Sequence, residues 1–252
     1  MWAGQGVASG GGYIDVITVA GTVGVMRASR ALTRAGPDNA VCVLCREFSG
    51  APPLYAPNLG SQISAQDGVS STSPALGCFV EGYLLNSPRE HVISTASLPP
   101  ALLAAYLERL HAVRQVVENA YGPTCMFEHG MSPGCSSGGC IDHAHMHIVP
   151  ATDVVATALL AASSFSPVHS WESLADRSDA AYLLISLPGE EGYRWAAPPL
   201  ALQSQHLRRV VAGALGVEDY DWAVASFLDT IVSTNNRLAP ALRAAYEQLA
   251  PA

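Results

Sequence analysis

The sequence contains no lysine. All 13 of its basic residues are arginine, and 21 acidic residues give a formal charge of −8. Lysine Schiff-base chemistry and a phosphate-loop lysine are therefore excluded. A net negative chain without a basic cluster also argues against binding to nucleic-acid backbones. An anionic substrate would have to be bound locally, by histidines, arginines and backbone N–H groups.

Long apolar runs are also missing. The best candidate, Ile14–Met26, is interrupted by Asp15, two threonines and two glycines, and it is too short to span a bilayer. No basic segment precedes it, so a secretory signal peptide is not expected. With 252 residues, 49% of them hydrophobic, the chain can bury a sizeable core. We expect a soluble, cytoplasmic protein with no membrane partner.

The six cysteines have no secretion signal to support disulfide bonds. Cys42 and Cys45 form a Cys-x-x-Cys motif, which indicates either half of a metal site or a redox pair. A redox pair normally opens a helix after a strand, and the segment Arg46–Pro53 does not continue as a convincing helix. The metal site is the favoured interpretation.

The segment Asp142–Pro150 places His143, His145 and His147 at alternate positions, with apolar residues between them. A strand sends successive side chains to opposite faces, so this pattern predicts one imidazole face and one apolar face. Neighbouring histidines would lie about 6.6 Å apart and the outer pair about 13 Å apart. Two other interpretations stay open, a zinc site of the His-x-His type and histidines that line a surface.

Periodicity and turn residues predict the other elements. Before the histidines come a strand over 78–86, a long helix over 99–121 with Ser97 as its cap, and a strand over 125–128. A glycine-rich loop over 130–139 then leads to a histidine strand over 141–150. After it we expect a hairpin of 182–187 with 193–195, and helices over 204–215, 221–235 and 240–249.

The run His143-Ala-His145-Met-His147-Ile-Val149 resembles the signature of the histidine-triad (HIT) superfamily, His-φ-His-φ-His-φ-φ with φ apolar. The segment Glu81–His91 resembles that family's Gly-His-x-Leu-x-x-Pro-x-x-His, and departs from it at Tyr83 and at Asn86-Ser87. The resemblance covers roughly 41–150. In addition, 204–209 is similar to a Ser-Gln-x-Leu-Arg-Arg segment in the extended C-terminal parts of some bacterial members.

The resemblance implies an α+β fold, a HIT-like antiparallel sheet with a long helix packed on it. We expect three parts: a partly disordered N-terminal segment over 1–40, a HIT-like catalytic domain over 41–150, and a C-terminal α/β extension over 151–252 packed on it. Many HIT proteins pair into two-fold dimers, so a homodimer is expected, although the extension could instead cover that surface.

The superfamily includes nucleotide hydrolases, dinucleoside polyphosphate phosphorylases and galactose-1-phosphate uridylyltransferase. The resemblance implies attack by His145 on a nucleoside α-phosphate, with a covalent nucleotidyl-histidine intermediate. His143 would orient His145 through its backbone carbonyl, and His147 would protonate the leaving oxygen or hold the phosphate charge. The substrate would be a nucleotide, a nucleotide-sugar or a dinucleotide. A full uridylyltransferase is less expected, because that class shows His-x-His-x-Gln.

Two further groups of residues are candidates by resemblance. The loop before the triad would bind phosphate through Ser137, Gly138, Gly139 and Cys140, where Cys140 stands in place of a common serine. Glycines allow backbone N–H groups to close on a phosphate, although a flexible turn would show the same residues. Glu128 could hydrogen-bond a ring nitrogen or a substrate hydroxyl, or it could be a solvated strand end.

Relatives in the superfamily hold zinc with a Cys-x-x-Cys, a histidine after the second strand and the first histidine of the triad. The matching positions here are Cys42, Cys45, His91 and His143. These ligands suit tetrahedral zinc with a structural role. Two alternatives to a nucleotidyl-transferring enzyme remain: a non-enzymatic, zinc-stabilised nucleotide-binding or interaction protein, and a metallohydrolase with catalytic zinc on His143 and His145.

Overall fold

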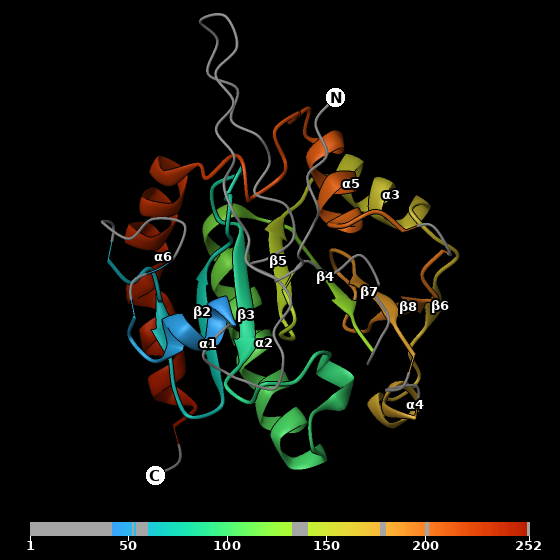
Figure 1. The fold of residues 1–252 in the computed structure, drawn as a ribbon, viewed down its shortest axis with the longest axis horizontal. Helices are drawn as coiled ribbons and strands as arrows, with labels where there is room; N and C mark the ends of the chain where they lie inside the picture. The colour runs from blue at the N-terminus through green and yellow to red at the C-terminus, as the bar shows by residue number, and fades with distance from the viewer. Residues whose placement is uncertain are drawn as a thin grey trace, which may run out of the picture.

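A single antiparallel sheet organises the computed structural model, which describes residues 42–51, 53, 60–132, 141–176, 180–199 and 202–250. Its eight strands lie in the order β1-β2-β3-β5-β4-β7-β8-β6 (Figure 1). Along the sheet their bounds are Ala65–Gln66, Ser70–Pro74, Leu84–Pro88, Met146–Pro150, Thr124–Gly130, Tyr182–Ser186, Arg194–Ala196 and Ser166–Pro167. With helices on both faces, this arrangement confirms the predicted α+β class.

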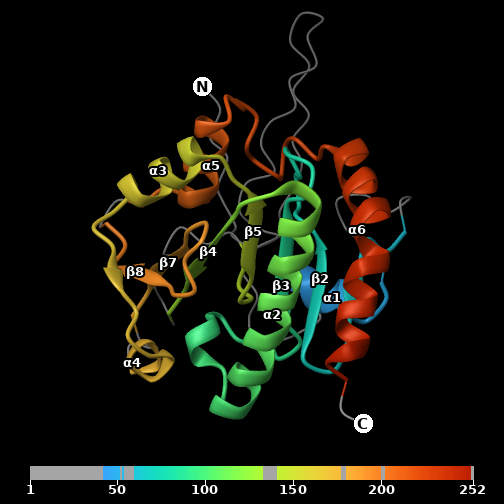
Figure 2. The same cartoon turned by 180° about the vertical axis from the view of Figure 1, so that it is seen from behind.

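Helices cover the two faces of the sheet. The long helices α2 (Pro100–Tyr121) and α6 (Leu228–Gln248) lie side by side on one face (Figure 2). The other face packs against α1 (Val43–Phe48), α3 (Asp153–Ala161) and α5 (His206–Ala214). The short elements η1 and α4 span Thr95–Ser97 and Trp171–Ala175. Among the described residues, no helix is long and apolar enough to cross a membrane.

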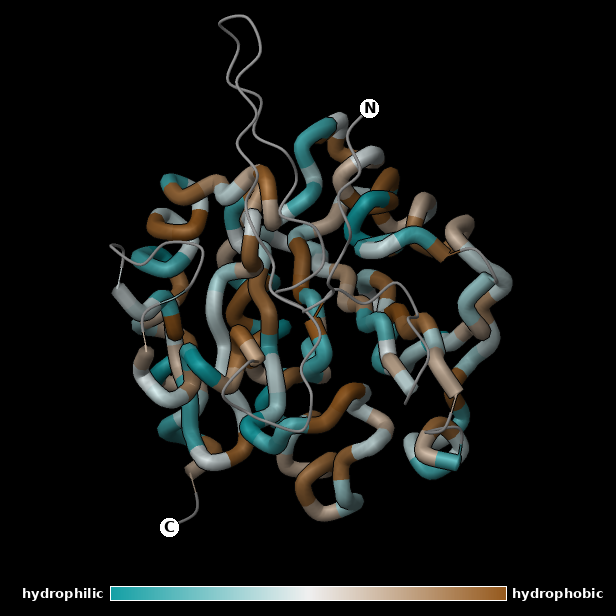
Figure 3. The backbone as a smooth tube through the Cα atoms, viewed as in Figure 1, coloured by the Kyte–Doolittle hydropathy of each residue, from teal (hydrophilic) through white to brown (hydrophobic). Residues whose placement is uncertain are grey.

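Strand alternation divides the apolar side chains between two cores. In β4, Met126 faces the core under α2 and α6, whereas Phe127 faces the core under α1, α3 and α5. Both cores are closely filled, because Met126 and Phe127 are each fully buried. The tube in Figure 3 shows the corresponding apolar segments running through the central strands. A strand buried on both faces places alternate side chains in the two cores. Strands β4 and β5 can therefore present polar side chains to a site on one face of the sheet and apolar side chains to the core on the other.

Helix α2 forms where the periodicity predicts it. Prolines open it, Leu103, Leu110 and Val117 face the sheet, and Gly122 closes it with a φ of 90°. The predicted cap was wrong, however. Pro99 occupies the N-cap and no side chain caps the helix, because Ser97 is the last residue of η1 and α2 begins only at Pro100.

Two predicted strands are shorter than expected. The strand predicted over 78–86 pairs with its neighbour only from Leu84 onward, because Gly82 (φ 86°) makes a turn. In this turn the Cα of Gly82 packs closely against the side chains of Tyr121 and Pro150. The histidine strand predicted over 141–150 begins its ladder at Met146. His143 and His145 therefore precede the regular strand, and the prediction of one regular strand that carries all three histidines was wrong.

Two helical predictions also needed correction. The segments 221–235 and 240–249 do not form two helices, because one helix, α6, runs through Pro240. Leu238 and Leu242 flank this proline and are both buried, so packing outweighs the one missing backbone hydrogen bond. Around Cys45, where no helix was expected, α1 forms a short one with Cys42 at its N-cap.

The C-terminal part of the chain extends the same sheet. The predicted hairpin is confirmed as β7 paired with β8, and β7 also pairs antiparallel with β4 along five residue positions. Helix α5, predicted over 204–215, packs its buried Leu207 and Val211 on this half of the sheet. Strand β5 therefore lies between β3 and β4, in the middle of the molecule.

Candidate active site and metal centre

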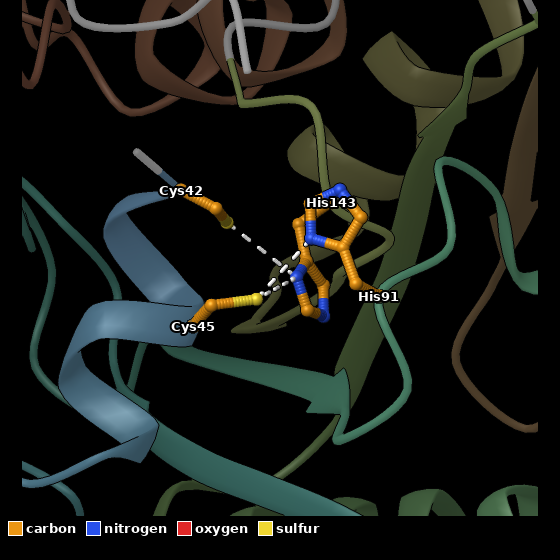
Figure 4. A group of neighbouring side chains, drawn as sticks. All are labelled: Cys42, Cys45, His91 and His143. Atoms are coloured by element: carbon orange, nitrogen blue, oxygen red, sulfur yellow. Dashed lines mark hydrogen bonds between the residues drawn. The ribbon is translucent and has the colours of Figure 1, made fainter. Parts of the chain in front are cut away.

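Four side chains converge as the sequence predicts for a metal site. The ligand atoms of Cys42, Cys45, His91 and His143 all lie within 4.8 Å of one another (Figure 4). The Sγ of Cys45 lies 3.2 Å from Nδ1 of His91 and 3.4 Å from Nδ1 of His143, and the Sγ of Cys42 lies 3.5 Å from Nδ1 of His143. Sulfur and nitrogen ligands on one tetrahedral zinc are separated by about 3.5 Å, given the usual bond lengths. The spacing therefore fits zinc.

The protonation state of His143 fits a metal ligand. Its Nε2 lies 2.8 Å from the carbonyl oxygen of Pro88. A carbonyl only accepts hydrogen bonds, so Nε2 carries the proton and Nδ1 presents its lone pair to the two cysteines. This is the arrangement that fixes the orientation of metal-binding histidines in general. Burial also lowers the pKa of His143, to about 4, which keeps the ring neutral.

The surroundings of Cys45 favour the protonated thiol over the thiolate, although Arg89 acts in the opposite direction. Burial, and then the neighbouring Cys42, raise the pKa of Cys45 to about 12. Two thiolates side by side in a buried site are unfavourable by themselves, and a bound dication reverses this by coordinating the deprotonated sulfurs. The described cysteines 42, 45, 78 and 125 are all free thiols, so no disulfide competes for the pair. The cluster has the chemistry of a closed structural site.

His145 is oriented by the residue two positions before it. Its Nδ1 lies 2.7 Å from the backbone carbonyl oxygen of His143. The same reasoning places the proton on Nδ1 and leaves a lone pair on Nε2. Burial lowers the pKa of His145, so the ring stays neutral. His145 is not part of the four-residue metal cluster, and within the described residues no hydrogen bond occupies its Nε2.

His147 lies in β5 opposite Leu85 and Phe127 in the ladder. Its ring stacks on Phe127 with centroids 4.4 Å apart, and its Nδ1 lies 2.6 Å from the hydroxyl of Tyr83. Its ring centroid is 4.9 Å from that of His145. The Tyr83 contact leaves Nε2 as the ring nitrogen of His147 that can meet a ligand. Burial holds the pKa of His147 well below its usual value.

A fourth histidine, His129, lies beside His145 and His147. His129 accepts a hydrogen bond at Nε2 from the backbone N–H of Leu207, at 3.0 Å, so its proton lies on Nδ1. Burial lowers the pKa of His129 to about 3. A pocket lies beside the histidines, with about 350 Å³ of space not filled by atoms, its opening included. Its lining is Leu76, Leu85, His129, Ile141, His145, His147, Gln205, Arg208 and Trp222.

The structure does not bring Glu128 to this pocket. Its carboxylate lies on the opposite face of β4 from His129, where Oε1 accepts hydrogen bonds from the backbone N–H and hydroxyl of Thr95, both at 2.8 Å. The hydroxyl of Tyr182 donates to Oε2 at 2.8 Å. The predicted substrate-binding residues Ser137, Gly138, Gly139 and Cys140 lie outside the described residues.

Sequence reasoning missed three residues of the pocket, His129, Gln205 and Arg208. It also missed Tyr83, whose hydroxyl contacts His147. Tyr83 stood out only as a departure from the HIT segment, where histidine is common. His129 follows Glu128 by one residue, and strand alternation around the neighbouring Phe127 could have assigned it to the histidine face. Gln205 and Arg208 belong to the Ser-Gln-x-Leu-Arg-Arg resemblance, which was noticed without a role.

No protein-family model matches the chain, and no curated protein matches it either. Among solved structures, the chain is similar to a HIT-like protein involved in cell-cycle regulation from Bartonella henselae, determined with an unknown ligand. That match has 13% sequence identity and a TM-score of 0.35, and it covers 46% of this chain and 83% of the other. A function for this chain must therefore be inferred from the geometry of its site.

Proposed function

We propose that this protein is a HIT-type enzyme, a nucleotide hydrolase or nucleotidyltransferase that acts at a nucleoside α-phosphate. The observation that supports this most directly is the hydrogen bond from Nδ1–H of His145 to the carbonyl oxygen of His143. A neutral imidazole held in one tautomer, with its other nitrogen facing a pocket, is prepared for nucleophilic attack. A ring that served only packing would have no need of this arrangement.

In the proposed reaction, Nε2 of His145 attacks the α-phosphorus and a P–N bond forms as the P–O bond to the leaving group breaks. The His143 carbonyl stabilises the positive charge that develops on the His145 ring. His147 donates the proton on its Nε2 to the leaving oxygen. Water or another acceptor then attacks phosphorus, the P–N electrons return to Nε2 of His145, and His147 takes up the acceptor's proton. Acid–base help of this kind contributes about 10²–10⁴ in rate.

The role proposed for the metal is structural. Zinc at Cys42, Cys45, His91 and His143 would fix the backbone of His143, whose carbonyl orients the nucleophile. A catalytic zinc on His143 and His145 is less well supported, because the two residues use different atoms for different partners. Nδ1 of His143 faces the cysteines, whereas Nδ1 of His145 faces a carbonyl oxygen.

The test is capture of the covalent intermediate. Wild-type protein turning over a p-nitrophenyl ester of adenosine monophosphate should, after rapid quench, carry one adenylyl group on His145 by peptide mass spectrometry. His145→Gln should abolish the adduct and turnover while zinc content and fold are retained. His111→Gln is the matched control, since His111 contacts Tyr193 away from the pocket. The absence of any adduct, together with substantial turnover by His145→Gln, would contradict the mechanism.

A further inference from the structure

The first turn of helix α5 forms one wall of the pocket beside His145 and His147. Gln205, at the N-cap of α5, and Arg208, one turn into it, both line that pocket. Both residues come from the C-terminal part of the chain, far in sequence from the triad. We call this pair the α5 wall.

Arg208 is a buried cation that has no anionic partner among the described residues. Arg208 is only 2% exposed, and among the described residues no carboxylate forms an ion pair with it. Its Nε donates to the carbonyl oxygen of Tyr220 at 2.7 Å, and its Nη2 donates to that of Gly77. The guanidinium also lies over the rings of Phe79 and Tyr83, with its Cζ 4.7 Å and 5.3 Å from their centroids.

Carbonyl oxygens and aromatic rings solvate this charge only in part. A buried charge is stable when an opposite charge completes its surroundings. Within the described part of the chain, Nη1 of Arg208 has no hydrogen-bond partner, so the fork still has N–H groups to offer. An anion that entered the pocket would supply the missing charge.

The other described residues of the pocket lining are neither acidic nor arginine. They are apolar, amide, indole and imidazole side chains. Arg208 is therefore the formally charged residue in the described lining of the pocket. Because the sequence has no lysine, a phosphate bound beside His145 has no other cationic side chain in this lining to meet.

Gln205 provides an independent sign of a missing ligand. It is 7% exposed and has a left-handed backbone, with φ 61° and ψ 31°, which is unfavourable for a residue with a side chain. Its Nε2 donates to Oδ1 of Asp221 at 2.9 Å. Its Oε1 is buried and accepts no hydrogen bond from the described residues. Buried acceptors are nearly always satisfied, so this oxygen lacks a donor that the ligand would bring.

We propose that the α5 wall recognises the substrate: Arg208 binds an anionic oxygen of the phosphate that His145 attacks, and Oε1 of Gln205 accepts a hydrogen bond from a donor group of the same ligand. This inference rests on the proposed function and names its ligand class, a phosphate ester that also carries a hydroxyl or amino group. Planar guanidinium groups suit phosphate oxygens because two N–H groups can bind them together.

The experiment measures binding of adenosine monophosphate by calorimetry to the zinc-loaded protein. We expect Arg208→Gln to weaken binding at least tenfold and Arg208→Lys to weaken it less, because lysine keeps the charge without the fork. Arg209→Gln is the matched control, since Arg209 lies over Tyr220 outside this pocket, and it should bind within twofold of wild type. Folding of each variant is checked by circular dichroism and zinc content.

A purely structural role for Arg208 would give a different result. Folded Arg208→Gln that binds adenosine monophosphate within twofold of wild type would overturn the proposal, and so would a wild type that does not bind it. If Arg208→Gln does not fold, a crystal structure of wild type with adenosine monophosphate decides. Phosphate oxygens within hydrogen-bonding distance of the guanidinium support the proposal, and a phosphate elsewhere overturns it.

The outcome is separable from that of the proposed function. Calorimetry with adenosine monophosphate requires no turnover and no adduct at His145. Binding that depends on Arg208 without any adduct would keep the α5 wall and reject the covalent mechanism. An adduct at His145 that forms with undiminished affinity in Arg208→Gln would do the opposite.

Discussion

The buried carboxylate of Glu128 should make the folded protein less stable as the pH rises. Burial raises the pKa of Glu128 from 4.5 to about 7, although Thr95 and Tyr182 donate hydrogen bonds that favour its ionised form. Desolvation is the larger effect because the residue is only 1% exposed. The folded state therefore holds a proton that the unfolded chain releases at lower pH.

The sign and size follow from linkage. Below pH 4.5 both states hold the proton and Glu128 has no pH-dependent cost. Between pH 4.5 and about 7 the unfolded chain ionises first, and the free energy of unfolding falls. At 1.36 kcal/mol per pH unit, the loss reaches about 3 kcal/mol and then stays constant at higher pH. Glu128→Gln should remove this dependence, because the neutral amide resembles the protonated carboxyl group.

The measurement is urea unfolding of wild type and Glu128→Gln at a series of pH values from 5 to 8. The difference between the two free energies of unfolding should change with pH in favour of the variant, by most of that 3 kcal/mol. Because both proteins contain the metal cluster, its own pH dependence cancels in the difference. Glu190→Gln is the control: Arg194 lowers the pKa of Glu190, so its difference should stay flat over this range. A flat difference for Glu128→Gln would refute the reasoning.

Three further predictions concern the metal, the packing and the assembly. Metal analysis should find about one zinc per chain. The variant Cys45→Ala should lose the zinc and melt at a lower temperature, whereas Cys78→Ala should keep it because Cys78 is outside the cluster. A metal-free wild type would contradict this. Gly130→Ala should lower the free energy of unfolding in urea by about 1–3 kcal/mol or more, because the new methyl group would overlap the Tyr182 ring. In Gly213→Ala the new methyl group meets nothing within 4 Å, so this variant should be as stable as wild type or more stable. Equal effects of the two substitutions would reject the packing argument. Light scattering at micromolar concentration should show a dimer, by resemblance to HIT proteins, and a monomer would exclude it.

Local patterns predicted the parts of the molecule that local physics determines. Helix α2 and the β7–β8 hairpin followed from periodicity and turn residues, whereas the α+β class was implied by the family resemblance. The cluster of Cys42, Cys45, His91 and His143 was predicted through the family resemblance, because ligands so far apart in sequence carry no local signal of convergence. In this respect the motif supplied what periodicity could not.

The rest depended on packing between distant segments. A proline at position 240 ends most helices, and only the shared core of Leu238 and Leu242 shows why α6 continues. The strand that contains the histidines begins later in the sequence than predicted. The backbone N–H of Ala144 donates to the carbonyl oxygen of Val92, which lies in a loop, rather than to a strand partner. In the sequence, nothing distinguishes Arg208 from an arginine at the surface, because its burial depends on the packing of α5 beside the triad.

The pairing of β4 with β7 has a consequence for any shortened form of the chain. All seven residues of β4 are buried, and five of them pair in register with residues of β7. A chain that ended at Pro150 would keep the triad and the cysteines but would leave β4 as a long, apolar edge strand. Such edges recruit strands from neighbouring molecules, so the truncated protein should accumulate as aggregates. The last hundred residues would then be needed for solubility as well as for chemistry, and a homologue could not lose them without gaining another strand in their place.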